Sequence, residues 1–220
     1  MNKNTTDKYM DRAGILLCLV GPTGSGKSTI SKMLLGRYGD ELAFSVSVTT
    51  RPPRKEEKDG REYIFIDKGG FEEKIKDGYF FEYEQVHCNF YGTPKDIMER
   101  GVKGEHDLLF DIDIRGAMSI KKAYPKNGVI VFLVPPSFQV MKERLEKRGQ
   151  MSDEQRQKRF KTAENEYALL LGAGYEQIDY FLVNSSLESA FEQSCNILET
   201  ERLKLCRLRR KRVEDLCEVA

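Results

Sequence analysis

A glycine-rich stretch near the start of the chain has the spacing of a loop that binds nucleotide phosphates. GPTGSGKST, residues 21–29, matches G-x-x-x-x-G-K-[ST]. Its glycines let backbone N–H groups surround a phosphate chain, and a helix after the loop adds positive potential. Lys27 would place a charge at the β- and γ-phosphates, and Ser28 offers a hydroxyl to Mg²⁺. We therefore expect these residues to bind a nucleoside triphosphate: Gly21, Pro22, Thr23, Gly24, Ser25, Gly26, Lys27, Ser28 and Thr29.

Two acidic residues end an apolar run further along the chain. In LLFDIDIRG, Asp111 and Asp113 are two positions apart, so on an ideal strand they face the same side. Ligands of open α/β sheets bind at the carboxyl ends of the strands, where the phosphate loop also lies. The pair therefore indicates a metal or nucleotide contact, although simple solvation of a strand end is the alternative.

Arginines form two further groups. SVSVTTRPPR presents Arg51 and Arg54 around two prolines, which hold the backbone extended. Beside a phosphate loop they suggest a second anionic substrate, although composition alone favours an ordinary charged loop.

A second group of arginines lies on two predicted helices. Arg144 and Arg148 lie four apart, hence on one helix face, and Arg156 and Arg159 follow on the next helix. Such guanidinium groups suit a lid that closes on phosphates, and spacing alone fits a solvated hairpin equally well.

The elements that must position these residues alternate between strands and helices. Short, continuously apolar runs predict buried parallel strands at residues 15–20, 106–114, 128–134 and 180–183, with AFSVSV as another. Helices are predicted at 27–38, 94–101, 116–124, 137–148, 152–171 and 187–216. Closely spaced short strands between residues 62 and 92 indicate a small, mostly antiparallel insertion. We expect an α/β protein: a three-layer core with a parallel sheet, a β-rich insert and a helical lid.

Composition excludes several classes of protein. The chain has 220 residues, 40% of them hydrophobic, which is enough for one substantial core. Its net charge of +1, from 36 basic and 35 acidic residues, argues against a nucleic-acid binder, and the basic run at 207–212 is expected to be a solvated helix face. Five cysteines without a C-x-x-C pair indicate reduced thiols and a cytoplasmic protein. The polar N-terminus and the short run at 15–20 predict neither signal peptide nor membrane span.

Several motifs together resemble the guanylate kinase family. GPTGSGKST, FSVSVTTRPPR, DGREYIF, FFEYEQVHCNFYGTP, LLFDIDIRGA and VPPS…LEKRG occur in the order and at the spacing seen in that family. The resemblance extends from about residue 14 to about residue 198. It implies the reaction ATP + GMP ⇌ ADP + GDP with Mg²⁺, by direct in-line transfer, with ATP and GMP as partners and dGMP as a further acceptor. It is compatible with a monomer or a homodimer.

The resemblance also assigns roles to individual residues. It implies that the GMP phosphate is held by Arg51, Arg54, Tyr63 and Tyr91, and that guanine is read by Ser47, Glu82, Thr93 and Asp113. Asp111 and Ser28 would hold the metal. The residues implied in catalysis are Lys27, Arg51, Arg144, Arg148 and Arg159. Asn184, after the last strand, is placed near the adenine.

The same resemblance divides the chain into parts. A polar segment covers residues 1–13 and the kinase domain covers 14–198, followed by a basic helical extension at 199–220. Within the domain, the core comprises 14–46, 103–136 and 172–198, the GMP-binding insert 47–102 and the lid about 137–171.

Two alternatives stay open. One is a non-catalytic guanylate-kinase-like module that binds proteins, which the intact Gly26, Lys27 and Ser28 disfavour. The other is a kinase for a different phosphorylated small molecule, which the guanine-reading residues disfavour. A GTPase switch protein would need an N-K-x-D element, and the sequence has none.

Overall fold

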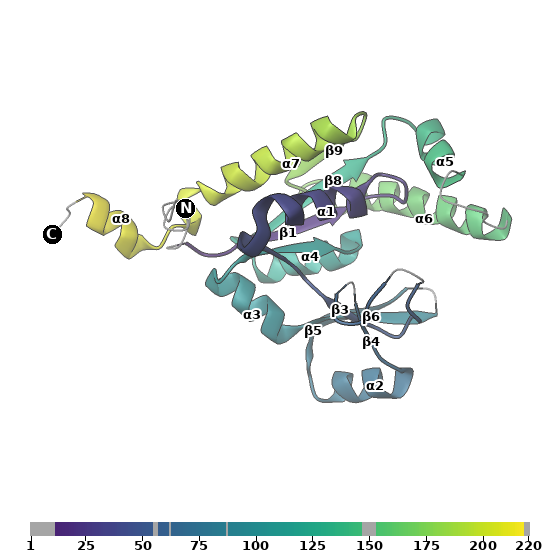
Figure 1. Cartoon of the computed structure of the whole chain (residues 1–220), viewed down its shortest axis with the longest axis horizontal. Coiled ribbons are helices and arrows are strands. Elements are labelled where there is room, and N and C mark those ends of the chain that lie inside the picture. Colours follow the sequence, from purple (N-terminus) through teal and green to yellow (C-terminus); the bar gives the residue numbers. More distant parts are fainter. Residues whose placement is uncertain (1–11, 55–56, 62, 87, 147–152, 218–220) are drawn as a thin grey trace.

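A computed structural model describes residues 12–54, 57–61, 63–86, 88–146 and 153–217. The predictions made for the N-terminal segment up to residue 11 therefore lie outside the described residues. Within the described residues, two sheets and the helices around them form a core with a smaller unit below it (Figure 1). No helix in this part of the chain is both long and apolar enough to cross a membrane.

The core is a parallel sheet of five described strands in the order β2-β7-β1-β8-β9. In the central strand β1, Cys18 is level with Phe110 of β7 on one side and with Ile130 of β8 on the other. Continuous apolar sequence forms these strands because both faces of the sheet are covered. The bounds are β1 Leu16–Val20, β2 Leu42–Phe44, β7 Asp107–Asp111, β8 Gly128–Val134 and β9 Tyr180–Val183.

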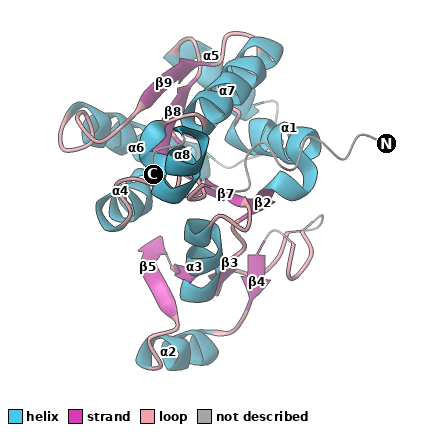
Figure 2. Cartoon of the chain, turned by 90° about the vertical axis from the view of Figure 1, so that its left-hand side faces the viewer, coloured by secondary structure: helices cyan, strands magenta, loops and turns pink. Residues whose placement is uncertain are grey.

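Helices cover the sheet on both faces and give the three predicted layers. Alternate residues of β1 enter different cores: Leu17 and Leu19 pack with helices α1 and α7, whereas Cys18 packs with α3, α4 and α6. Figures 1 and 2 show α1 and α7 on one side of the sheet and α4 on the other. The bounds are α1 Lys27–Tyr38, α3 Lys95–Lys103, α4 Ile114–Ala123, α5 Phe138–Glu146, α6 Asp153–Leu171 and α7 Leu187–Arg202. The predicted α/β class is confirmed.

The insert has its own small sheet and its own core. Its described strands run in the order β4-β3-β6-β5, and β3 pairs in parallel with β4 but antiparallel with β6. Phe71 of helix α2 stacks on Phe80 and Phe90, with ring centroids 4.4 and 5.3 Å apart. Figure 2 shows α2 at the far end of this unit. The bounds are β3 Ser47–Thr49, β4 Tyr63–Phe65, α2 Lys68–Lys76, β5 Phe80–Val86 and β6 Asn89–Pro94.

One predicted strand is in fact two. AFSVSV was expected to be a single parallel strand, but β2 ends at Phe44 and pairs with β7, whereas β3 begins at Ser47 and belongs to the insert. Between them, the backbone N–H of Ser45 still donates to the Leu109 carbonyl of the core sheet. Arg51 and Arg54 therefore follow a strand of the insert and not a strand of the core.

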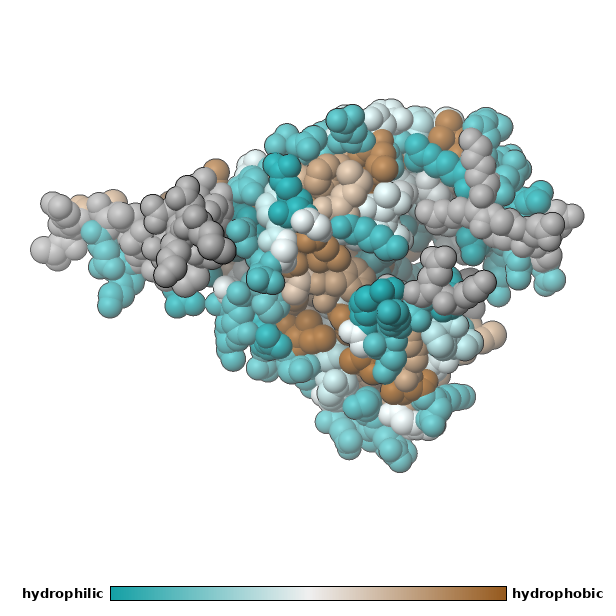
Figure 3. All heavy atoms as spheres, in the orientation of Figure 1, coloured by the Kyte–Doolittle hydropathy of each residue, from teal (hydrophilic) through white to brown (hydrophobic). Residues whose placement is uncertain are grey.

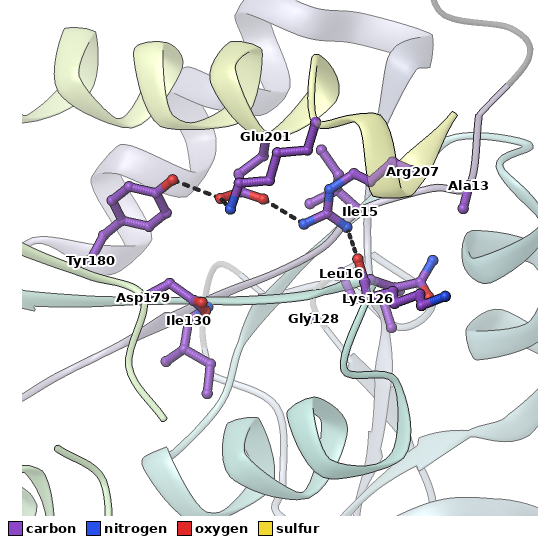
Figure 4. Close-up of polar contacts among 12 residues, drawn as sticks. Ala13, Ile15, Leu16, Lys126, Gly128, Ile130, Asp179, Tyr180, Glu201 and Arg207 are labelled. Atoms are coloured by element: carbon purple, nitrogen blue, oxygen red, sulfur yellow. Dashed lines mark hydrogen bonds and ion pairs between the residues drawn. The ribbon is translucent and has the colours of Figure 1, made fainter. Parts of the chain in front are cut away.

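The long helix predicted at 187–216 is also interrupted. Helix α7 ends at Arg202, a 3₁₀ turn follows at Leu205–Arg207, and helix α8 covers Arg210–Cys217. The interruption has a tertiary cause, because the Arg207 carbonyl accepts from the Ala13 N–H at 2.8 Å. Its guanidinium reaches the Lys126 carbonyl and the Glu201 carboxylate, while Tyr180 donates to the same carboxylate at 2.6 Å (Figure 4).

A second buried ion cluster surrounds Asp107 at the amino end of β7. Both oxygens of this fully buried carboxylate accept from the Arg12 guanidinium, at 2.8 and 2.7 Å. Arg202 Nε donates at 2.9 Å and the Ile15 N–H at 2.8 Å. Asp107 thus joins the N-terminal segment, the sheet and the end of α7 by charge-assisted hydrogen bonds.

We predict that Asp107→Ala destabilises the protein by about 3–5 kcal/mol, because it removes the buried carboxylate that accepts from both Arg12 and Arg202. Urea unfolding followed by circular dichroism measures this. Glu99→Ala breaks an exposed pair with Lys103 and serves as a control whose urea midpoint stays near that of the wild type. Equal midpoint shifts in both variants would contradict the prediction.

Candidate active site

The phosphate loop connects β1 to α1 and depends on two glycines in particular. Gly21 and Gly26 have φ of 129° and 102°, values that other residues rarely adopt. A Cβ on Gly21 would lie 2.1 Å from the Leu133 carbonyl oxygen, and one on Gly26 would lie 2.3 Å from the Asn184 side-chain nitrogen. The Leu133 backbone therefore demands glycine at position 21, and the positive φ together with the Asn184 side chain favours glycine at position 26, independently of any ligand.

Lys27 is the first residue of α1 and folds back over the loop that precedes it. Its Nζ donates to the carbonyl oxygens of Gly21 and, at 3.3 Å, of Pro22. The ammonium group therefore lies at the mouth of the loop, where it also lines a cavity between the core and the insert.

Asp111, the last residue of β7, lies beside the start of α1. Ser28 Oγ donates to Asp111 Oδ2 at 3.2 Å, so a hydroxyl and a carboxylate meet next to Lys27. Asp113 lies beyond the strand, where its Oδ1 caps α4 by accepting from the Gly116 N–H at 2.8 Å. The expectation that both carboxylates share one strand face is thus wrong, because β7 ends before Asp113. Both nevertheless line the cavity.

We call this cavity the inner cavity. It encloses about 270 Å³ and brings together residues from the core, the insert and helix α6. A wider hollow, the outer cleft of about 920 Å³, adjoins it between α1 and the insert, where Figure 3 shows hydrophobic surface beside strongly hydrophilic surface. Predicted site residues that line the inner cavity are Lys27, Ser47, Tyr63, Glu82, Tyr91, Asp111 and Asp113. Those that line the outer cleft are Ser28, Arg51, Arg54, Tyr63, Tyr91 and Asp111.

Glu82 and Thr93 face each other across the β5–β6 pair. Thr93 is buried, and its Oγ1 donates to Glu82 Oε1 at 2.6 Å. Burial raises the pKa of Glu82; the Thr93 hydrogen bond opposes this change, and the nearby charge of Asp113 adds to it. Thr93 thus acts on the inner cavity by fixing the carboxylate that lines it.

Two tyrosines stand where the inner cavity and the outer cleft meet. Tyr63 and Tyr91 are edge to face, with ring centroids 5.9 Å apart. Burial, followed by the charge of Asp111, raises the pKa of Tyr63 to about 12. Its hydroxyl therefore stays protonated and can donate a hydrogen bond throughout the physiological pH range.

The arginines predicted to belong to a lid do not all lie at the site. Arg144 of α5 donates to the Asn184 carbonyl at 2.9 Å and to the Gly24 carbonyl at 3.4 Å, so it holds the backbone around the phosphate loop. Asn184 itself donates to the Ser25 carbonyl at 2.7 Å. In the described part of the chain neither Arg144 nor Arg159 lines the inner cavity or the outer cleft. Arg148 lies outside the described residues.

The structure adds three carboxylates that the sequence analysis missed. Glu57 lies in the outer cleft, whereas Glu84 and Glu166 line the inner cavity. The alternation of β5 could have identified Glu84, because it shares a strand face with Glu82. Burial and then the neighbouring Asp113 raise the pKa of Glu84 to about 7. Glu57 and Glu166 carry no comparable signal, since each is one of many acidic residues in a charged segment.

Glu166 approaches the phosphate loop from helix α6. Its Oε2 is buried and has no hydrogen-bond partner among the described residues. Burial raises the pKa of Glu166 to about 7; Lys27 opposes this change, whereas Asp113 and Asp111 reinforce it. Helix α6, which the sequence analysis assigned to a lid, therefore contributes a carboxyl group close to the predicted site of phosphoryl transfer.

Comparison with known proteins identifies relatives over nearly the whole chain. A family model described as guanylate kinase matches residues 14–201. Proteins named guanylate kinase are 41% identical in Maricaulis maris, over 94% of this chain and 91% of the relative, and 40% identical in Clostridioides difficile, over 94% and 98%. The crystal structure of guanylate kinase from Anaplasma phagocytophilum is similar with a TM-score of 0.75, at 31% identity, covering 97% of this chain and all of that one.

We predict that Glu166→Gln stabilises the protein more at high pH than at low pH. A carboxyl group whose pKa is raised from 4.5 to about 7 by folding costs little stability below pH 4.5 and its full amount above pH 7. The difference in unfolding free energy between variant and wild type should grow by roughly 2 kcal/mol from pH 5.5 to pH 8. Urea unfolding at both pH values measures it; a difference that does not change with pH would contradict the prediction.

Proposed function

This chain belongs to the guanylate kinase family, and we propose that it transfers the γ-phosphoryl group of ATP to GMP, giving ADP and GDP. The observation that carries the proposal is that one cavity is lined both by Lys27 of the phosphate loop and by Ser47, Tyr63, Glu82 and Tyr91 of the insert. Groups suited to a triphosphate and groups suited to a nucleoside monophosphate therefore share one space, as direct transfer requires.

In this proposal, side chains of the insert recognise the guanine base. Thr93 occupies Glu82 Oε1, which leaves Oε2 to accept from the N1–H and N2–H₂ groups of guanine. Asp113 offers a further oxygen beside Glu82, and the hydroxyl of Ser47 donates to O6 or N7. AMP has an acceptor at N1, so its binding would place a lone pair against this carboxylate.

The GMP phosphate lies between Arg51, Arg54, Tyr63 and Tyr91. The two guanidinium groups neutralise charge that would otherwise repel the triphosphate, and the two tyrosine hydroxyls donate hydrogen bonds. A phosphate oxygen of GMP attacks the γ-phosphorus, the bond to the β-phosphate oxygen breaks, and ADP leaves. Positioning and charge neutralisation supply the catalysis, without a covalent enzyme intermediate.

The residues Ser28 and Asp111 fit a hard divalent cation such as Mg²⁺. Both offer oxygen, at 3.2 Å from each other, and Mg²⁺ is commonly held by one or two protein oxygens together with substrate phosphates and water. In the described ranges, no group of three or more His, Cys, Asp or Glu is suited to a metal, in keeping with a site that the nucleotide completes. The ion would neutralise the β- and γ-phosphates.

The lid acts after both substrates are bound. We assign residues 137–171 to the lid, 47–102 to the GMP-binding insert and the remainder of 14–198 to the core. Arg144 steadies the phosphate loop through its backbone contacts, while Arg148 and Arg159 are proposed to reach the transferring group and exclude water. A cytoplasmic location and a monomeric or homodimeric state remain predictions.

We predict that Lys27→Ala lowers kcat by at least about a hundredfold, because it removes a charge aimed at the transferring phosphoryl group. A coupled assay of ADP release with saturating ATP and GMP measures turnover. Arg37→Ala removes an exposed charge from the last turn of the same helix and should retain wild-type turnover. Near-wild-type turnover in the Lys27 variant would overturn the mechanism.

The same assay tests the acceptor base. We expect activity with GMP and dGMP, and activity with AMP, CMP and UMP lower by at least about a hundredfold, because only guanine presents two donors to Glu82. Activity with AMP but not with GMP would overturn the base assignment. No ADP release with any monophosphate would favour the non-catalytic alternative.

A further inference from the structure

Glu57 lies in the loop between β3 and β4, where it contacts Arg51 and the backbone of Arg54. Both of its carboxylate oxygens accept from Arg51 Nη2 at 2.9 Å. Its Oε2 also accepts from the backbone N–H of Arg54 at 2.8 Å. One carboxylate therefore fixes a side chain and the local backbone of a single turn.

Arg51 is held from several directions. Its Nη1 donates to the Pro52 carbonyl at 2.8 Å, and its guanidinium carbon lies 5.4 and 5.7 Å from the ring centroids of Tyr63 and Phe65. Only 13% of the Arg51 side chain and 15% of the Glu57 side chain is exposed to solvent. A sheltered arginine in this setting has few alternative rotamers, so it is already ordered before it meets an anion.

The lowered pKa of Glu57 keeps its carboxyl group ionised. Burial alone would raise the pKa of Glu57, but the Arg54 N–H and the Arg51 guanidinium outweigh burial and lower it. The carboxylate stays ionised and offsets one of the two positive charges that Arg51 and Arg54 bring to the outer cleft. Without it, two neighbouring guanidinium groups would repel each other.

We propose that Glu57 is a positioning residue for the acceptor phosphate: it orients Arg51 and shapes the Arg51–Arg54 turn so that both can bind the phosphate of the monophosphate substrate. This inference rests on the proposed function of the same site. The carboxylate acts through arginine and touches no reacting atom. Its effect should fall on the monophosphate, because the hydrogen bonds of Glu57 go to Arg51 and Arg54, whereas the triphosphate is assigned to the loop at residues 21–29.

The contacts also argue against a competing role. A carboxylate that merely occupied the phosphate position would have to leave when GMP binds. Glu57 is instead part of the turn that it stabilises, since Oε2 accepts from the Arg54 backbone three residues away. Competition would make removal of the charge tighten GMP binding, whereas positioning makes removal weaken it. The sign of the change separates the two roles.

The test is steady-state kinetics of Glu57→Gln, which keeps the shape of the side chain and one oxygen but removes the charge. We expect KM for GMP to rise about tenfold, with KM for ATP changed by less than about twofold and kcat nearly retained. Glu72→Gln, in an exposed pair with Lys68 on α2 of the same insert, is the matched control and should behave as wild type.

Equilibrium binding distinguishes a role in phosphate binding from a general structural role. Only the former would weaken the binding of GMP without weakening that of guanosine. Titration calorimetry should show weaker binding of GMP to Glu57→Gln but unchanged binding of guanosine, which lacks the phosphate. In the background of Arg51→Ala, adding Glu57→Gln should raise KM for GMP by much less than it does in the wild type, because Arg51 is gone and only the contact with the Arg54 backbone is left to weaken. If Glu57→Gln does not fold, Glu57→Asp, which withdraws the carboxylate by one methylene, should show the same GMP-selective loss.

Three outcomes would overturn the inference. These are an unchanged or lower KM for GMP, an equal weakening of GMP and guanosine, and full additivity with Arg51→Ala. Failure of the proposed function looks different, because the wild type itself would then release no ADP with GMP.

Discussion

Parallel pairing of β1 with β7 and β8 is the constraint on which the site depends. It brings the carboxyl ends of the three strands to one edge of the sheet, so the phosphate loop after β1 lies beside Asp111 at the end of β7. The neighbouring strand β9 leads to Asn184, whose side chain donates to the Ser25 carbonyl within that loop. The loop therefore contacts residues from strands on both sides of β1, namely Asp111 of β7 and Asn184 after β9. Because the strands are buried on both faces, a slip in their register would be costly and the edge stays in place.

The inner cavity combines many carboxyl groups with a single lysine among its described lining residues. Glu82, Glu84 and Glu166 all have raised pKa values, and burial is the first cause in each case. Such a cavity disfavours an additional free anion unless cations or hydrogen-bond donors accompany it. In the proposed function, guanine N–H groups donate hydrogen bonds to the carboxylates. Mg²⁺, Lys27 and the arginines would neutralise the charge of the phosphates. On this proposal, the acidic groups of the inner cavity and the arginines of the outer cleft would set the orientation of the monophosphate.

Much of the fold could be predicted from the sequence because it is encoded locally. Apolar runs predict the core strands, and the phosphate loop is recognisable from the spacing of its glycines together with Lys27 and Ser28. AFSVSV was predicted wrongly because strand propensity does not tell which sheet a strand joins. The break after Arg202 was missed because its cause is a contact between Arg207 and Ala13, which are far apart in the chain. The role of Glu57 was likewise invisible, since it depends on burial and on which arginine the loop presents.

The cluster around Asp107 also constrains the order in which the chain acquires its structure. Arg12 and Asp107 are synthesised well before Arg202, which follows the last strand of the sheet. A growing chain that has folded its strands but lacks α7 would hold the Asp107 carboxylate with Arg12 in place and Arg202 still missing. We therefore expect the core to be completed only when α7 has been made, since α7 supplies part of it, although the phosphate loop and Asp111 come long before in the sequence. Packing of α7 at the amino end of β7 is thus expected to be a late event in the assembly of a protein whose candidate site lies at the opposite end of the strands.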